Sequence, residues 1–224
     1  MGRRLFRGAE IFDGVRLGPG SLLVESGKVR SVLPADARLP DVETVDLAGG
    51  MLAPGFVDLQ VNGGGGLMFN DAPEVATLRV MAEAHARLGS LTILPTLITD
   101  TPEATRAAVA AVAQAVAEGV PGIAGIHLEG PHLSRARKGA HDAALIRPMT
   151  EADLAFLLSA AERVPKLVLT VAPEAIDNEH ISALSTAGIH VSLGHSDAGF
   201  ETCLDAIAAG ARMTTHLFNA MSPL

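Results

Sequence analysis

After Pro54 the sequence alternates between short apolar segments typical of strands and longer segments with helical periodicity. The strand-like segments lie at 55–62, 91–97, 122–130, 166–173, 188–196 and 212–220, and the helical patterns lie at 74–88, 103–118, 151–163, 178–187 and 200–209. Parallel strands need crossover connections of this kind, and the crossover helices cover the sheet. We therefore predict an α/β fold, a (β/α)₈ barrel with about six of its eight strands present, with a doubly wound open sheet as the alternative.

Residues 1–52 have a different texture, in which short strands alternate with Gly, Asp and Pro. This spacing favours a small β-domain, and "VESGKV" at 24–29 is typical of a hairpin tip. We therefore expect two domains: a small N-terminal β-domain at 1–52, and an incomplete barrel at 53–224.

Composition excludes several classes of protein. The net charge of −8 gives no basic surface for nucleic acid, and no run of 18 apolar residues could span a membrane. The single Cys203 cannot form an internal disulfide, so we expect a cytoplasmic protein.

Polar residues stand at the C-terminal ends of three predicted strands: Glu129 in "HLEGPH", His195 in "GHSD" and His216 in "THLFNA". Barrel enzymes assemble their active sites at these ends. Two His and one Glu form a known catalytic zinc set, and a divalent metal activates water and polarises a carbonyl. The pattern indicates a hydrolytic metal site; the alternative is three unrelated structural residues.

The other histidines are assigned by position. His127 shares a strand face with Glu129, which makes it a neighbour that orients a ligand or an alternative ligand. Three others lie in or beside helices and receive structural roles: His85, His180 and His190.

The loop at 134–142 concentrates positive charge in Arg135, Arg137 and Lys138. It is either a solvated loop or a site for an anionic substrate group. The run "NGGGG" at 62–66 permits close backbone approach to a ligand, but it lacks the residues of a P-loop.

The motifs "PGFVDLQVNGGGG", "LPTLIT", "HLEGPHLSRARKGAH", "VAPE", "GHSDA" and "THLFNAM" occur in this order. Together they resemble the N-acetylglucosamine-6-phosphate deacetylases of the amidohydrolase superfamily. The resemblance implies a (β/α)₈ barrel with a small β-sandwich domain built from both chain ends. It also implies hydrolysis of N-acetylglucosamine 6-phosphate to glucosamine 6-phosphate and acetate.

Transferred to this sequence, the resemblance implies the metal ligands Glu129, His195 and His216, and the substrate contacts Ala140, His141, Asn219 and Ala220. Gln60 and Asn62 stand where some members carry a histidine pair, which implies one divalent metal: zinc, with iron or another divalent ion as alternatives. Gln60, Asn62, His127 and Lys138 are expected to line the site. The implied partners are a phosphorylated amino sugar and a second copy of the chain.

In this family the acid/base Asp follows the eighth strand, beyond residue 224, so the sequence resembles a C-terminally truncated member. We expect the 224-residue chain alone to lack useful activity. The alternative functions are an inactive remnant or fragment, and another amidohydrolase such as an acyl-amino-acid deacylase.

Overall fold

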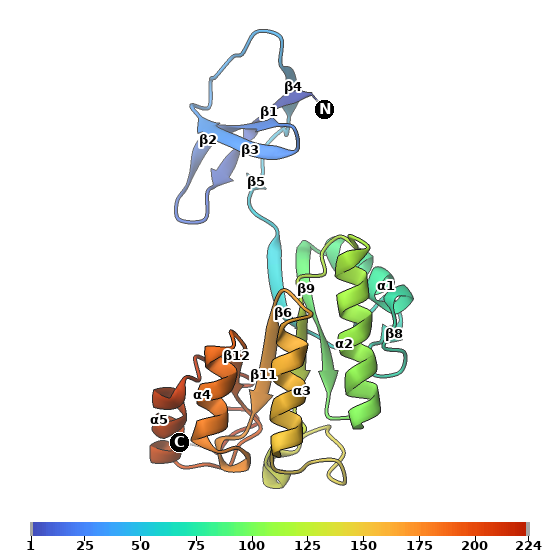
Figure 1. Ribbon diagram of the computed structural model, residues 1–224. Coiled ribbons are helices and arrows are strands. Elements are labelled where there is room, and N and C mark those ends of the chain that lie inside the picture. The colour runs from blue at the N-terminus through green and yellow to red at the C-terminus, as the bar shows by residue number, and fades with distance from the viewer. Residues whose placement is uncertain (1, 223–224) are drawn as a thin grey trace. The chain divides into compact units, whose positions relative to one another are not determined.

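The computed structural model describes residues 2–222, and the chain divides after Gly55 into two compact units. The first unit is one five-stranded sheet (Figure 1). Its strands are β1 (Arg3–Phe12), β2 (Leu17–Glu25), β3 (Lys28–Leu33), β4 (Glu43–Asp46) and β5 (Met51–Leu52). Their order is β3-β2-β1-β4, and β5 also pairs with β1. The described residues of this unit thus form a single sheet, and a second layer that would make it a sandwich is not among them.

Turn chemistry fixes the hairpins of this sheet. The carboxylate of Asp13 accepts the backbone N–H groups of Val15 and Arg16 between β1 and β2. Ser26 and Gly27 both have positive φ and join β2 to β3, which confirms the predicted hairpin tip.

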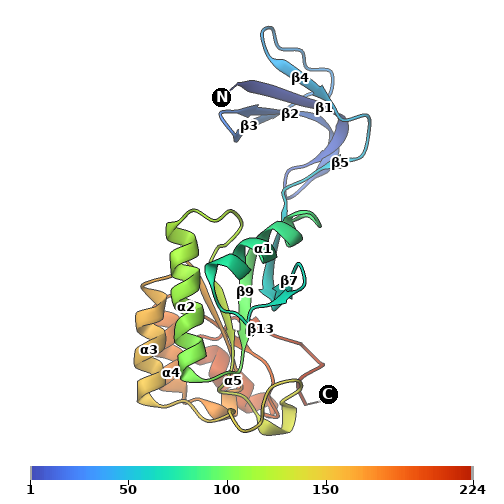
Figure 2. The same ribbon diagram turned by 90° about the vertical axis from the view of Figure 1, so that its right-hand side faces the viewer.

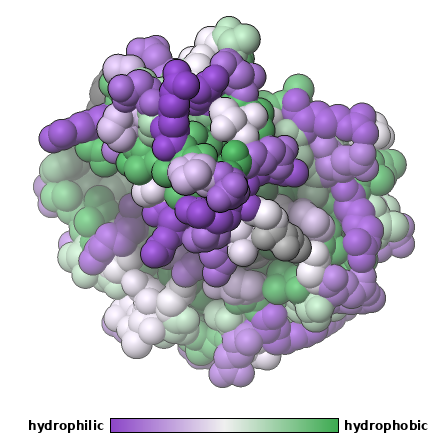
Figure 3. Space-filling view, turned by 90° about the horizontal axis from the view of Figure 1, so that it is seen from above, coloured by the Kyte–Doolittle hydropathy of each residue, from purple (hydrophilic) through white to green (hydrophobic). Residues whose placement is uncertain are grey.

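Figure 3 shows one face of the molecule, where hydrophilic side chains are interspersed with hydrophobic ones.

The second unit is built on a six-stranded parallel sheet. Its strands are β6 (Phe56–Val61), β9 (Ser90–Ile98), β10 (Ile126–Glu129), β11 (Leu167–Val171), β12 (His190–Leu193) and β13 (Met213–Thr214). Spatial order follows chain order, β6-β9-β10-β11-β12-β13. Two short strands, β7 (Gly63–Gly64) and β8 (Leu67–Met68), form a separate ribbon after β6.

Five helices connect these strands: α1 (Val75–Ala86), α2 (Pro102–Ala117), α3 (Glu151–Ala161), α4 (Asn178–Thr186) and α5 (Phe200–Ala209). Because consecutive strands are neighbours and crossovers are right-handed, the helices cover one face of the curled sheet (Figures 1 and 2). This arrangement is that of a partial (β/α) barrel, and it argues against the doubly wound alternative. No helix among residues 2–222 is long and apolar enough to cross a bilayer.

Capping residues set the helix limits. Thr101 accepts the backbone N–H of Ala104 at the start of α2, Pro102 occupies the first turn, and Gly119 with φ of 68° follows its end. At α3, Thr150 and Asp153 form a reciprocal capping box. The predicted helices are confirmed to within about two residues at each end.

Most strands are shorter than predicted, and two of them show the reason. The segment 122–130 becomes a strand only at Ile126, because Gly122 and Gly125 have positive φ. The segment 212–220 leaves the sheet after Thr214, and a turn follows in which Asn219 N–H donates to the carbonyl of His216.

Alternate side chains of β10 point to opposite faces of the sheet, one covered by helices and the other concave. Ile126 and Leu128 are buried in the apolar core between sheet and helices. His127 and Glu129 are equally buried, but their side chains lie on the opposite, concave face. The polar residues of interest therefore lie inside the curl of the sheet.

Candidate metal centre

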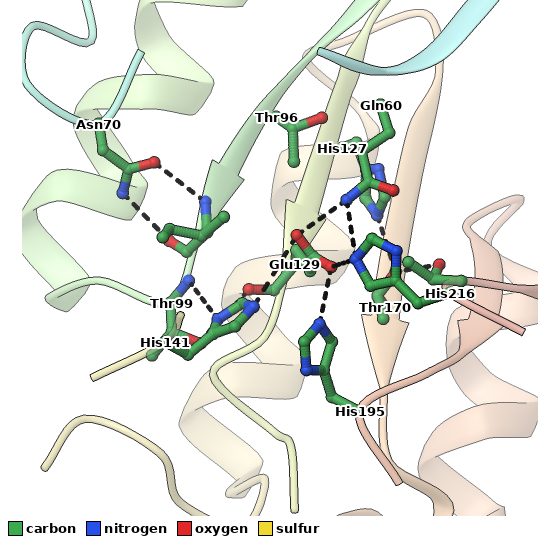
Figure 4. A network of polar contacts seen from close by, with 12 residues as sticks. Gln60, Asn70, Thr96, Thr99, His127, Glu129, His141, Thr170, His195 and His216 are labelled. Carbon is green, nitrogen blue, oxygen red and sulfur yellow. Dashed lines mark hydrogen bonds and ion pairs between the residues drawn. The ribbon is translucent and has the colours of Figure 1, made fainter. Parts of the chain in front are cut away.

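Three strand ends bring the predicted ligands together (Figure 4). Glu129 is the last residue of β10, and His195 and His216 follow β12 and β13 by two residues. His195 Nε2 lies 3.0 Å from Glu129 Oε1, and His216 Nε2 lies 2.9 Å from the same oxygen. One carboxylate oxygen thus faces two imidazole nitrogens from separate strands.

Unusual backbone directs both histidines to this point. His195 has φ of 50° and His216 has φ of 54°, in the left-handed region, which costs roughly 1–2 kcal/mol per residue. Gly194 allows the chain before His195 to lie close to the chain before His216, because a Cβ at Gly194 would lie 2.8 Å from the carbonyl oxygen of Thr215. Backbone strain at two adjacent strand ends is typical of functional sites.

The hydrogen bond at its other nitrogen fixes the tautomer of His195. Its Nδ1 lies 2.7 Å from the carbonyl oxygen of Arg137, which can only accept, so Nδ1 carries a proton. In the neutral ring, Nε2 then presents a lone pair to Glu129. Burial lowers the pKa of His195, but the hydrogen bonds to Glu129 and Arg137 outweigh it and raise that pKa.

Glu129 is ionised although it is buried. Burial by itself would raise its pKa, but the hydrogen bond with His195 and the positive charge of neighbouring histidines lower it to about 2. A carboxylate oxygen with two imidazole nitrogens about it is the kind of donor set that binds a divalent metal. The donor set Glu129, His195 and His216 therefore fits a divalent metal ion.

His141 also reaches this cluster. Its Nε2 lies 3.9 Å from Glu129 Oε2, and a ligand atom of His141 lies within 4.8 Å of those of Glu129 and His195. However, its Nδ1 lies 3.2 Å from the backbone N–H of Thr99, which can only donate, and 2.7 Å from the Thr99 hydroxyl, which can donate as well; both contacts favour the proton of the neutral ring on Nε2. Burial lowers the pKa of His141 to about 4, which keeps the ring neutral. His141 is thus a hydrogen-bond donor facing the site, whereas His195 is an acceptor.

Both ring nitrogens of His127 are engaged away from this centre. Nδ1 lies 3.0 Å from the carbonyl oxygen of Leu59, and Nε2 lies 2.7 Å from the hydroxyl of Thr170. Burial lowers the pKa of His127. These contacts argue against ligation and favour the interpretation as a neighbour of the ligands.

Of the pair that ends the first strand, Gln60 lies in the site. Its amide Nε2 donates to Glu129 Oε2 at 3.0 Å and lies 3.4 Å from His216 Nε2. The backbone carbonyl of Asn62 accepts from Phe69, and among the described residues no polar contact joins the Asn62 side chain to Glu129.

The remaining predicted residues lie on two exposed loops. Ala140 follows Gly139, whose carbonyl accepts from the exposed Lys138 ammonium at 3.3 Å. Asn219 and Ala220 lie in the turn after His216, to whose carbonyl both backbone N–H groups donate.

The positive loop is partly neutralised. Arg137 pairs with Asp197 at 2.8 Å, while Arg135 donates to the carbonyl of Ile146. In residues 2–222, Lys138 has no acidic partner. The loop also acts through its backbone, because the carbonyl of Arg137 holds His195.

Sequence reasoning missed Thr99 and the role of Arg137. Thr99 directly follows β9, so the strand-end rule that identified Glu129 would have found it. The Arg137 carbonyl carries no signal in the sequence, since any residue offers the same oxygen.

Comparison with known proteins gives a consistent result. The amidohydrolase family matches residues 51–223. An N-acetylgalactosamine-6-phosphate deacetylase of Shewanella sp. (strain ANA-3) is 50% identical over 80% of this chain and 45% of that protein. An N-acetylglucosamine-6-phosphate deacetylase of Haemophilus influenzae is 36% identical over 91% of this chain and 53% of that protein. The chain thus spans about half the length of these relatives.

Two solved structures are similar. The N-acetylglucosamine-6-phosphate deacetylase of Pasteurella multocida has a TM-score of 0.93 at 35% identity, over 99% of this chain and 58% of that one. A mutant of the Mycobacterium smegmatis deacetylase in complex with N-acetylglucosamine 6-phosphate has a TM-score of 0.87 at 35% identity, over 100% and 57%.

Proposed function

The chain belongs to the amidohydrolase family, and from that premise we propose that it takes part in hydrolysing N-acetylglucosamine 6-phosphate to glucosamine 6-phosphate and acetate. The observation that carries this proposal is the convergence of Glu129, His195 and His216 on one point, with the donor His141 beside them. The names of the relatives support the substrate class.

Glu129, His195 and His216 would hold one divalent ion, for which we propose zinc, with iron as the alternative. Such an ion, when bound, polarises an amide carbonyl and lowers the pKa of water. Gln60 supports a single ion, because its amide already occupies Glu129 Oε2 and an amide is a poor ligand for a transition metal.

The chain's own residues would bind and orient the sugar. His141 Nε2–H would donate to a substrate oxygen, since Thr99 fixes the proton on that nitrogen. We assign the remaining substrate contacts to the two exposed loops: Lys138, Ala140, Asn219 and Ala220. The family resemblance places the acid/base aspartate after an eighth strand, in a part of the relatives that this sequence does not span.

N-acetylgalactosamine 6-phosphate is a second candidate substrate. The Shewanella relative that is named for it is 50% identical, whereas the Haemophilus relative named for the glucosamine compound is 36% identical. The two sugars are epimers, so a few contacts to one hydroxyl decide between them.

The wider architecture belongs to the same proposal. It comprises closure to eight strands, a small β-sandwich domain including 1–52, a barrel domain beginning at 53, a homodimer and a cytoplasmic location. The six parallel strands and the five-stranded sheet are consistent with it.

The test is acetate release by the protein as it occurs in its organism, supplied with zinc. We expect turnover of one or both phosphorylated N-acetylhexosamines, and little turnover of unphosphorylated N-acetylglucosamine or of N-acetylmethionine. His141→Ala should weaken phosphosugar binding while metal content stays unchanged, and His190→Ala, an exposed histidine at the start of β12, is the control. Preferred turnover of N-acetylmethionine would replace the proposal with an acyl-amino-acid deacylase.

A further inference from the structure

Strand β6 departs from regular pairing just before the metal centre. Asp58 pairs with Ile93 and Val61 pairs with Pro95, so three steps along β6 oppose two along β9. Such a bulge bends a strand and redirects its side chains. Pro95 contributes to the irregularity because it has no N–H to donate to its neighbour.

Two side chains form hydrogen bonds with the backbone of the bulge. His127 Nδ1 donates to the carbonyl of Leu59 at 3.0 Å, and the hydroxyl of Thr96 accepts the N–H of Val61 at 2.9 Å. Thr96 and His127 are paired residues of β9 and β10, and both are buried. Together they hold the bulge on either side of Gln60.

A chain of buried hydroxyl groups fixes the ring of His127. The Leu59 carbonyl can only accept, so Nδ1 carries the proton and Nε2 accepts from Thr170 at 2.7 Å. Thr170 therefore accepts from Thr215 at 2.8 Å, and Thr215 accepts from Ser192 at 2.7 Å. Every proton in the row points toward β6, because one carbonyl sets the direction of all the others.

The bulge places Gln60 against Glu129. The Gln60 amide donates to Oε2 at 3.0 Å, which leaves Oε1 to face His195 and His216 (Figure 4). We propose that His127 is a positioning residue that holds the β6 bulge, so that Gln60 occupies one oxygen of Glu129 and presents the other to the metal. This inference rests on the metal ligation that the proposed function assigns to Glu129.

A double-mutant cycle on metal affinity tests this coupling in the native protein, without substrate. Zinc affinity is measured by competition with a chromophoric chelator, and the visible spectrum of bound cobalt reports ligand geometry. Gln60→Ala and His127→Leu should each weaken zinc binding by about 10-fold or more. The double variant should bind no more weakly than the weaker single variant, because both changes break one path.

Two further variants make the test specific. His127→Asn keeps a donor near the Nδ1 position and should restore most of the affinity and the cobalt spectrum. His132→Leu is the matched control, since His132 is also buried and its Nδ1 also contacts a backbone carbonyl, that of Arg147 at 3.2 Å. It should leave zinc affinity unchanged. If His127→Leu does not fold, Thr170→Val removes the hydroxyl that orients the ring and should weaken zinc in the same direction.

Independent losses that multiply in the double variant would overturn the inference, as would normal zinc affinity in His127→Leu. A wild-type protein that binds no zinc would overturn both this inference and the metal site. A protein that binds zinc with the expected coupling but releases no acetate would refute only the proposed reaction.

Discussion

Two buried histidines of the site have different roles, and the hydrogen-bond partner of Nδ1 determines the role of each. Arg137 offers a carbonyl to His195, which leaves Nε2 as an acceptor, whereas Thr99 offers an N–H to His141, which leaves Nε2 as a donor. Distance alone would group His141 with Glu129 and His195 as ligands. The donor role of His141 instead leaves His216 as the second histidine, since its Nε2 faces the same carboxylate oxygen as that of His195.

This assignment predicts metal content directly. His195→Ala and His216→Ala should each lose zinc on dialysis, because each removes a ring nitrogen that faces Glu129 Oε1. His141→Ala should keep about one ion per chain. Metal per chain is measured by mass spectrometry after dialysis, and loss of zinc from His141→Ala together with retention in His216→Ala would transfer the ligand role to His141.

The sequence was sufficient to predict which residues converge, but not the contacts that distinguish their roles. Glu129, His195 and His216 follow from the rule that active sites gather at the carboxyl ends of barrel strands. The tautomers depend on Arg137 and Thr99, which are 58 and 42 residues away from their histidines along the chain. Only the folded chain brings such partners together.

Elements of secondary structure were predictable where local signals agree. Thr101, Pro102 and Gly119 mark the limits of α2, and the structure places them at those limits. Strand ends were less predictable, because Gly125 departs from the strand for a tertiary reason: a Cβ there would lie 2.0 Å from the carbonyl oxygen of Lys166. The β6 bulge was equally hidden, since it requires β9 as a neighbour.

The start of α3 gives a prediction at this scale. Asp153 completes the capping box and accepts a two-pronged ion pair from Arg147. Asp153→Ala should lower the free energy of unfolding by about 1–2 kcal/mol at neutral pH. Glu162→Ala, at the exposed far end of the same helix, is the control and should change it little.

The effect of Asp153 depends on pH in a defined direction. Burial would raise its pKa, but the hydrogen bonds from Arg147 and Thr150 outweigh burial and lower the pKa. A lowered carboxyl pKa stabilises the fold above the unfolded value, near about 4, and this stabilisation is lost as the pH falls further. The difference between wild type and Asp153→Ala in chemical denaturation should therefore shrink below about pH 4. A constant difference down to pH 2 would contradict the ionic contribution.

For the whole molecule, the parallel strand order follows from the repeated strand–helix pattern and right-handed crossovers. The curl of the sheet brings the ends of β10, β12 and β13 to one carboxylate. The number of crossovers can be predicted from the sequence pattern. The curl of the sheet cannot, because it arises from the packing of all six strands.

Metal binding should stabilise one unit selectively, because all three proposed ligands belong to the unit that begins at Phe56. At a free zinc concentration of about 100 times Kd, the expected gain is roughly 2.7 kcal/mol, or a rise in Tm of about 5–10 °C. Thermal unfolding followed with and without a chelator should move the transition of that unit alone. His195→Ala should show no rise, and an equal shift in that variant would assign the stabilisation to another zinc site.

The left-handed backbone at His195 and His216 also limits how this site can evolve. Gly, Asn and Asp adopt that conformation most easily, so the backbone restricts which residues can replace these histidines, whichever metal is bound. Asp and Asn are hard oxygen donors, which suit magnesium, calcium or manganese. A lineage whose metal preference changes would thus replace a histidine nitrogen by an Asp or Asn oxygen more readily than by a cysteine thiolate.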